Sequence, residues 1–126
     1  MKTVSRVLAW TILISVASLF VMLGLAKFTG QSSIRWAERF AHWGYPMVFR
    51  YVVGGLEILG GIGLIAPATT RPAAAVLMVV MAGAFYTHLS HGEMPRIVPP
   101  LMLGTLVLLI FLWRHPLRHV VRPSGQ

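Results

Sequence analysis

The sequence contains no cysteine, and only three of its 126 residues are acidic. Without cysteine, the chain has no disulfide, no thiolate metal site, no cysteine-held iron–sulfur cluster and no dithiol redox chemistry of its own. Any electron transfer would therefore require a bound cofactor or a partner protein.

Charge of both signs is scarce. Charged residues make up 11% of the chain, whereas a soluble domain carries about 25%. Hydrophobic residues make up 56%, and the mean hydropathy is +0.74, so lipid is expected to cover most of the surface. The net charge is +8. Because the basic residues lie mostly at the ends of apolar runs and not in one stripe, they indicate anionic head groups and no nucleic acid.

Four apolar runs have about the length that crosses a membrane. They are Val7–Ala26, Val48–Ala66, Pro72–His91 and Ile97–Trp113. Short links containing proline separate the later runs, and such links make neighbouring helices antiparallel. We predict an all-α membrane protein, an up-down bundle of four transmembrane helices, in which residues 1–126 form a single integral membrane domain.

The longest link contains an amphipathic pattern over residues 32–43. Four polar residues recur at helical spacing on one face, and aromatic residues share that spacing on the other. The polar residues are Arg35, Glu38, Arg39 and His42; the aromatic ones are Trp36, Phe40 and Trp43. The pattern predicts an interfacial helix with two interpretations. Its aromatic residues, together with Trp113, anchor the bundle at the interface, or the helix forms a lid over a cavity.

The first run raises the question of a signal peptide, because Gly24 and Ala26 offer small residues at a cleavage site. Its apolar core is longer than the usual 7–15 residues, which favours a retained helix. With four spans, both termini lie on the same side of the membrane. That side carries six of the basic residues, and the other side carries five. The positive-inside rule then predicts cytoplasmic termini.

Glu57 is the one residue that hydrophobicity does not explain. It lies near the middle of the second run, close to the membrane midplane, where a carboxylate costs a few kcal/mol and usually faces a protein interior. Arg50, Gly54 and Gly61 lie on the same helical face. Those glycines permit close helix packing or leave room for a ligand.

With cytoplasmic termini, Arg50 lies in the outer half of the membrane. Three further polar residues fall in that half: Lys27, His88 and Tyr86. We expect Glu57, Lys27, His88 and Arg50 to converge on an outward-facing polar pocket, to which Tyr86 adds a hydroxyl. The alternatives are that Lys27 and Arg50 extend to head groups and that His88 bonds a neighbouring helix. Glu57 itself would then be a buried structural carboxylate.

The histidines do not support a metal or haem. Haem between helices requires histidines at matching depths, but His115 and His119 fall on the opposite side of the membrane from His88 and His91. A metal site with Glu57 and His88 has no ligand-spacing support. The pair His115 and His119 is better explained as part of a basic tail that anchors to head groups.

The chain resembles the DoxX-like family of small bacterial inner-membrane proteins over about residues 19–108. The resemblance rests on sequence segments that occur in the family's order and spacing. These are LFVMLGLAKFTG (19–30), GYP (44–46), VVGGLEILGGIGLI with Glu57, TTRPAAAVL and AFYTHLSHGE (84–93) with His88.

This resemblance implies a four-helix bundle with cytoplasmic termini and no settled general activity. Some relatives are associated with membrane redox systems, including a quinone-reducing subunit, and distant ones with membrane-protein assembly. Lys27, Glu57 and His88 match the family pattern. We therefore expect an accessory subunit that binds a lipophilic or quinone-like molecule, or docks a membrane or peripheral oxidoreductase. The alternative is a structural or chaperone-like partner, and a second copy of the chain, in a homo-oligomer, is a further expected partner.

Overall fold

The computed structural model describes residues 3–113, and every regular element in that range is helical. In chain order the elements are α1 (Thr3–Leu25), α2 (Gly30–His42), α3 (Met47–Ile65), α4 (Thr70–Ser90), the short 3-10 helix η1 (Met94–Ile97) and α5 (Val98–Leu112). The prediction of an all-α chain with four long helices and an amphipathic helix after the first is confirmed. The largest difference in helix bounds is at α1, which begins at Thr3 and not at Val7.

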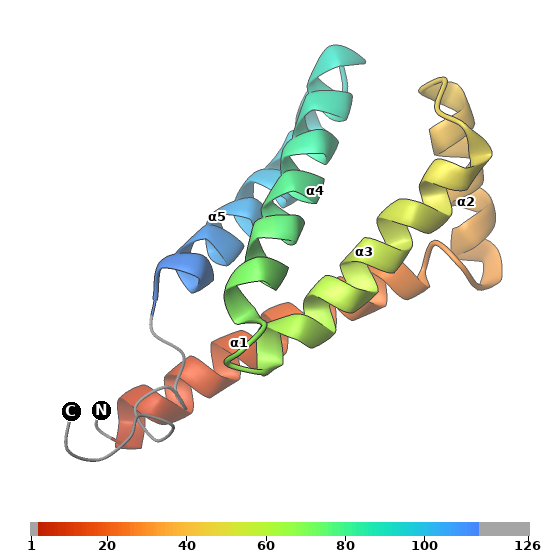
Figure 1. The fold of residues 1–126 in the computed structure, drawn as a ribbon. Helices are drawn as coiled ribbons and strands as arrows, with labels where there is room; N and C mark the ends of the chain where they lie inside the picture. The colour runs from red at the N-terminus through yellow and green to blue at the C-terminus, as the bar shows by residue number, and fades with distance from the viewer. Residues whose placement is uncertain (1–2, 114–126) are drawn as a thin grey trace.

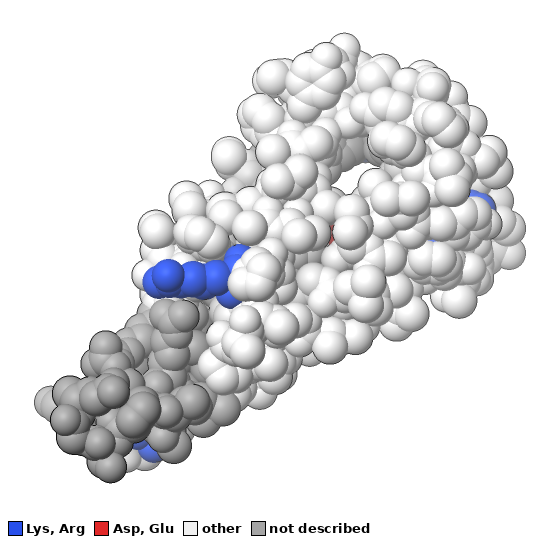
Figure 2. Space-filling model, in the orientation of Figure 1, with Lys and Arg blue, Asp and Glu red and all other residues white. Residues whose placement is uncertain are grey.

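Four helical segments are long and apolar enough to cross a membrane: α1, α3, α4 and the continuous stretch Met94–Leu112. Only 17–33% of the most apolar window of each segment is buried inside the protein. Most of the apolar surface therefore faces outward, where lipid would cover it. Figure 2 shows that charged groups on the visible face are confined to a few places. The chain is a multi-pass membrane protein.

The helices form two arms that diverge from one end of the molecule (Figure 1). In one arm α1 packs along α3, and in the other α5 packs along α4, while α3 and α4 contact each other near the link between them. The core holds buried side chains from all four long helices, among them Phe20, Leu64, Leu77 and Ile110. The space-filling view shows an opening between the arms (Figure 2).

Close packing of α1 on α3 depends on glycine. A Cβ atom added to Gly24 would lie 2.5 Å from the carbonyl oxygen of Gly54, and one added to Gly61 would lie 2.8 Å from that of Ala17. Gly54 itself lies against the Cβ of Lys27. These glycines let the two backbones approach closely, as small residues do between membrane helices.

Two glycine turns bring the ends of the two arms toward each other. Gly44, with φ 82°, lies in the turn between α2 and α3, and Gly92, with φ 71°, lies in the turn after α4. Positive φ is accessible to glycine without a steric penalty. The first turn carries Trp43 and the second carries Glu93, and these two side chains meet.

Candidate functional site

Lys27 and Glu57 form a buried ion pair between the two helices of the first arm. Lys27 follows the end of α1, and Glu57 lies in the middle of α3. The Nζ atom of Lys27 is 2.6 Å from Oε1 of Glu57, and the two residues are 3% and 2% exposed. No other donor among the described residues reaches Oε1, so Lys27 is the one partner of this oxygen there.

Trp36 of α2 covers the lysine. The Nζ atom lies 4.0 Å from the centroid of the Trp36 ring, a cation–π distance. It also donates a hydrogen bond of 3.3 Å to the carbonyl oxygen of Leu23. Carboxylate, carbonyl and ring together surround the ammonium group, so protein groups replace its water.

Arg50 has other partners. Its Nη1 donates to the carbonyl oxygen of Ser33 at 2.7 Å, its Nη2 donates to the hydroxyl of Tyr51, and its guanidinium lies over the Tyr51 ring. The side chain is 8% exposed, so it does not extend to head groups. It joins α3 to the start of α2. The expected convergence on Glu57 therefore does not include Arg50.

His88 belongs to a second polar group near the end of the other arm. Its Nδ1 is 2.8 Å from Oε1 of Glu93. The same carboxylate oxygen accepts a hydrogen bond of 3.2 Å from Nε1 of Trp43, and Oε2 is 3.4 Å from Nη1 of Arg96. Nearby, the Tyr45 and Thr87 hydroxyls are 2.7 Å apart. These contacts tie the loop after α2 to α4.

Glu93 is the functional candidate that sequence reasoning missed. The available signal was its rarity, because only two other acidic residues occur in the chain. Its pairing with His88 depends on the Gly92 turn, which folds the chain back over the end of α4. Spacing alone does not predict that contact.

Low pH is expected to weaken the contacts that Glu93 makes with His88, Trp43 and Arg96. The hydrogen bond with His88 holds the pKa of Glu93 below its ordinary value of 4.5, and Trp43 and Arg96 act in the same direction while partial burial opposes them. A carboxylate with a lowered pKa stabilises the folded state above its unfolded pKa, and this contribution is lost as the pH falls through the folded value.

The measurement is the difference in melting temperature between the wild type and Glu93→Gln, taken in detergent from about pH 7 to about pH 3. We expect a constant difference above about pH 4.5 that shrinks towards zero at lower pH. A difference that does not change with pH would show that the charge of Glu93 does not stabilise the fold.

A row of aromatic rings on α2 joins the two polar groups. Trp36, over Lys27, lies 6.1 Å from Phe40, and Phe40 lies 5.3 Å from Trp43, whose ring is 5.4 Å from that of His88. Phe40 is 5% exposed, so it packs on protein and does not serve as the lipid anchor expected from the sequence. The arrangement favours the lid interpretation of this helix.

The remaining predicted residues lie outside both polar groups. Tyr86 is 66% exposed, so its hydroxyl adds nothing to the Lys27–Glu57 pair. Trp113 is half-buried, and its indole nitrogen has no hydrogen-bond partner among the described residues. Within residues 3–113, no three His, Asp or Glu side chains gather as metal ligands would. His115 and His119 lie outside the described residues.

This arrangement can hold a polar ligand group and handle protons. The Lys27 ammonium is a hydrogen-bond donor, the Glu57 carboxylate is an acceptor, and both are shielded from water. His88 and Glu93 form a second acid–base pair nearer the end of the spans. Paired acidic and basic side chains are the groups that general acid–base catalysis uses.

Comparison with known proteins identifies the family of the chain. A family model described as the DoxX-like family matches residues 11–110, which is most of the chain. No curated protein and no solved structure shows significant similarity to the chain.

Proposed function

The chain belongs to the DoxX-like family, and from this premise we propose that it is an accessory subunit of the bacterial inner membrane. In this role it binds a lipophilic, quinone-like molecule, or docks a membrane redox partner, through the Lys27–Glu57 pair. The protein acts together with an oxidoreductase and is not an independent enzyme.

The observation that carries this proposal is the buried ion pair inside a membrane span. Glu57 is ten residues into α3, about 15 Å from its start at 1.5 Å per residue. An ionisable group at such depth costs a few kcal/mol and typically marks a ligand or proton path. A buried salt bridge is by itself weak support for stability, because well-packed apolar residues often do as well. Retaining both charges is therefore better explained by a function.

The chemistry of a quinone fits these groups. A quinone carbonyl accepts hydrogen bonds, which the Lys27 ammonium supplies, and reduction of a quinone consumes protons, which a carboxylate can transfer. His88 and Glu93 are a second acid–base pair, nearer the end of the spans. The opening between the two arms (Figure 2) offers a flat lipophilic ring a way in from the membrane.

The same proposal includes cytoplasmic termini. Of the five basic residues assigned to the opposite side, Lys27 and Arg50 are buried among the helices. That leaves Arg35, Arg39 and Arg96 on that side against six basic residues on the side of the termini. The positive-inside rule supports this orientation.

Replacing Glu57 by glutamine is expected to weaken quinone binding about tenfold or more, because the Lys27 ammonium loses the carboxylate that holds it in place to donate to the quinone carbonyl. The measurement is the rise in melting temperature that decylubiquinone causes in the detergent-purified protein, since a ligand stabilises the state that binds it. Glu38→Gln is the matched control, because Glu38 is exposed on α2. Equal shifts in all three proteins would contradict the proposal.

A structural or chaperone-like partner is the second candidate function. The observation in its favour is that the ion pair also joins α1 to α3, beside the close contact of Gly24 and Gly54. This function predicts that Glu57→Gln lowers the melting temperature or the yield of a complex, and that decylubiquinone stabilises neither protein. Crosslinking in native membranes would show whether copies of the chain associate.

A further inference from the structure

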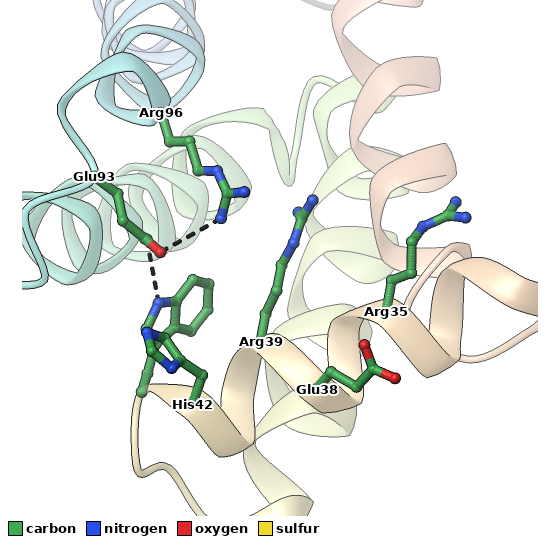
Figure 3. Close-up of a pocket in the computed structure, with 7 residues that line it drawn as sticks. Arg35, Glu38, Arg39, His42, Glu93 and Arg96 are labelled. Atoms are coloured by element: carbon green, nitrogen blue, oxygen red, sulfur yellow. Dashed lines mark hydrogen bonds and ion pairs between the residues drawn. The ribbon is translucent and has the colours of Figure 1, made fainter.

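A pocket of about 250 Å³ lies between the polar face of α2 and the link from α4 to α5 (Figure 3). The proposed quinone-like function makes no use of it. Its polar lining comprises three arginines, two glutamates and a histidine: Arg35, Arg39, Arg96, Glu38, Glu93 and His42. Figure 3 shows Arg39 and Arg96 extending from opposite walls into the space between them.

The positive charge of this pocket is incompletely neutralised. Glu93 is shared among His88, Trp43 and Arg96, and its contact with Arg96 is a long 3.4 Å. Among residues 3–113, neither Arg35 nor Arg39 forms an ion pair, with Glu38 or with any other carboxylate. Arg39 only lies over the Trp36 ring, at 4.9 Å.

Gathering guanidinium groups around one cavity is unfavourable unless an anion joins them. Arginine presents a planar set of donors that matches phosphate oxygens in pairs. The volume is that of about eight liquid waters, at about 30 Å³ each. A phosphate group with a small substituent fits this space better than a drug-sized molecule does.

The location favours phosphate over other anions. The pocket lies at the ends of the spans, against the amphipathic helix α2. Helices of this kind lie at the head-group level of a membrane, where phosphates are abundant.

We propose that this pocket binds the phosphate group of an anionic ligand, carried by a phospholipid head group or by a soluble phosphate ester. Arg39 and Arg96 coordinate the phosphate oxygens, and Arg35, which lines the same pocket, adds positive charge beside them. Because the pocket is built from α2 and from the link before α5, the ligand holds together the outer ends of the two arms, beside the Trp43–Glu93 hydrogen bond. The proposal does not depend on the function of Lys27 and Glu57.

The test is titration calorimetry on the full chain in a neutral detergent with three probes. These are dihexanoyl phosphatidylglycerol, glycerol 3-phosphate and, as a zwitterionic comparison, dihexanoyl phosphatidylcholine. Saturable binding of phosphatidylglycerol alone supports the site with a lipid as its source. Saturable binding of glycerol 3-phosphate supports it with a soluble ester as the source.

Variants then locate the site. Arg39→Gln and Arg35→Gln are each expected to weaken binding of the active probe about tenfold. Arg35 is exposed and makes no ion pair within the described residues, so its replacement leaves folding intact. Arg71→Gln is the matched control, because it removes the same charge at the other end of α4 from the pocket. There Arg71 lies over the Phe111 ring.

Two results would overturn the proposal. One is the absence of saturable binding for phosphatidylglycerol and for glycerol 3-phosphate. The other is binding by Arg35→Gln and Arg39→Gln that equals binding by Arg71→Gln, since general attraction to a basic protein would then explain the signal.

Discussion

Replacing Lys27 by methionine is expected to lower the free energy of unfolding by about 3–5 kcal/mol, because it leaves the Glu57 carboxylate buried without its counter-charge. The aliphatic stem survives in methionine, so the change removes mainly the ammonium group. It also removes the cation over Trp36 and the hydrogen bond to Leu23. The measurement is unfolding of the purified protein by sodium dodecyl sulfate, followed by circular dichroism.

The double variant Lys27→Met/Glu57→Met separates charge from packing. It is expected to recover most of the lost stability, because apolar residues often replace a buried ion pair at little cost. A double-mutant cycle on these two positions gives their interaction energy directly. If the double variant is less stable than both single variants, packing around the side chains matters more than their charge.

Replacing Gly24 by alanine is expected to destabilise the protein by about 1–3 kcal/mol or more, as overpacking does. The added methyl group would lie 2.5 Å from the carbonyl oxygen of Gly54 and 2.6 Å from Cγ1 of Ile58. Because the first obstacle is backbone, the two helices have to move apart. That movement also separates Lys27 from Glu57, so the variant is expected to impair ligand binding together with stability.

Gly83→Ala and Gly55→Ala are the matched controls for this prediction. An added Cβ meets nothing within 4 Å at either position. Each replacement is therefore expected to leave stability unchanged or to raise it by up to about 1 kcal/mol, through the better helix propensity of alanine. Unfolding by dodecyl sulfate compares all three variants. Equal destabilisation by Gly24→Ala and Gly83→Ala would contradict the close-packing role of Gly24.

The sequence predicted one half of the polar site and not the other. Counting residues along α1 and α3 placed Lys27 and Glu57 in the same outer half of the membrane, and they meet. Arg50 shares the helical face of Glu57, but helical side chains lean toward the N-terminus of their helix. Its guanidinium is therefore carried away from Glu57, and it reaches the carbonyl oxygen of Ser33.

His88 and Phe40 illustrate why the rest of the site was beyond prediction. The partner of His88 is Glu93, five residues later, and the contact requires the reversal of the chain at Gly92. Phe40 has the spacing of a lipid-facing anchor, yet it is buried because α2 turns its aromatic face toward the protein. Amphipathic spacing identifies an apolar face without saying whether lipid or protein covers it.

The sequence by itself determined the class of the protein, the four apolar helices and the place of Glu57 in the middle of one of them. These follow from local composition and from the constant rise of a helix, so no knowledge of distant contacts is needed. Only the tertiary structure decided which charges pair, that α2 covers Lys27 through Trp36, and that three arginines line one pocket. Those outcomes depend on how closely glycine lets α1 approach α3 and on how two turns direct the chain.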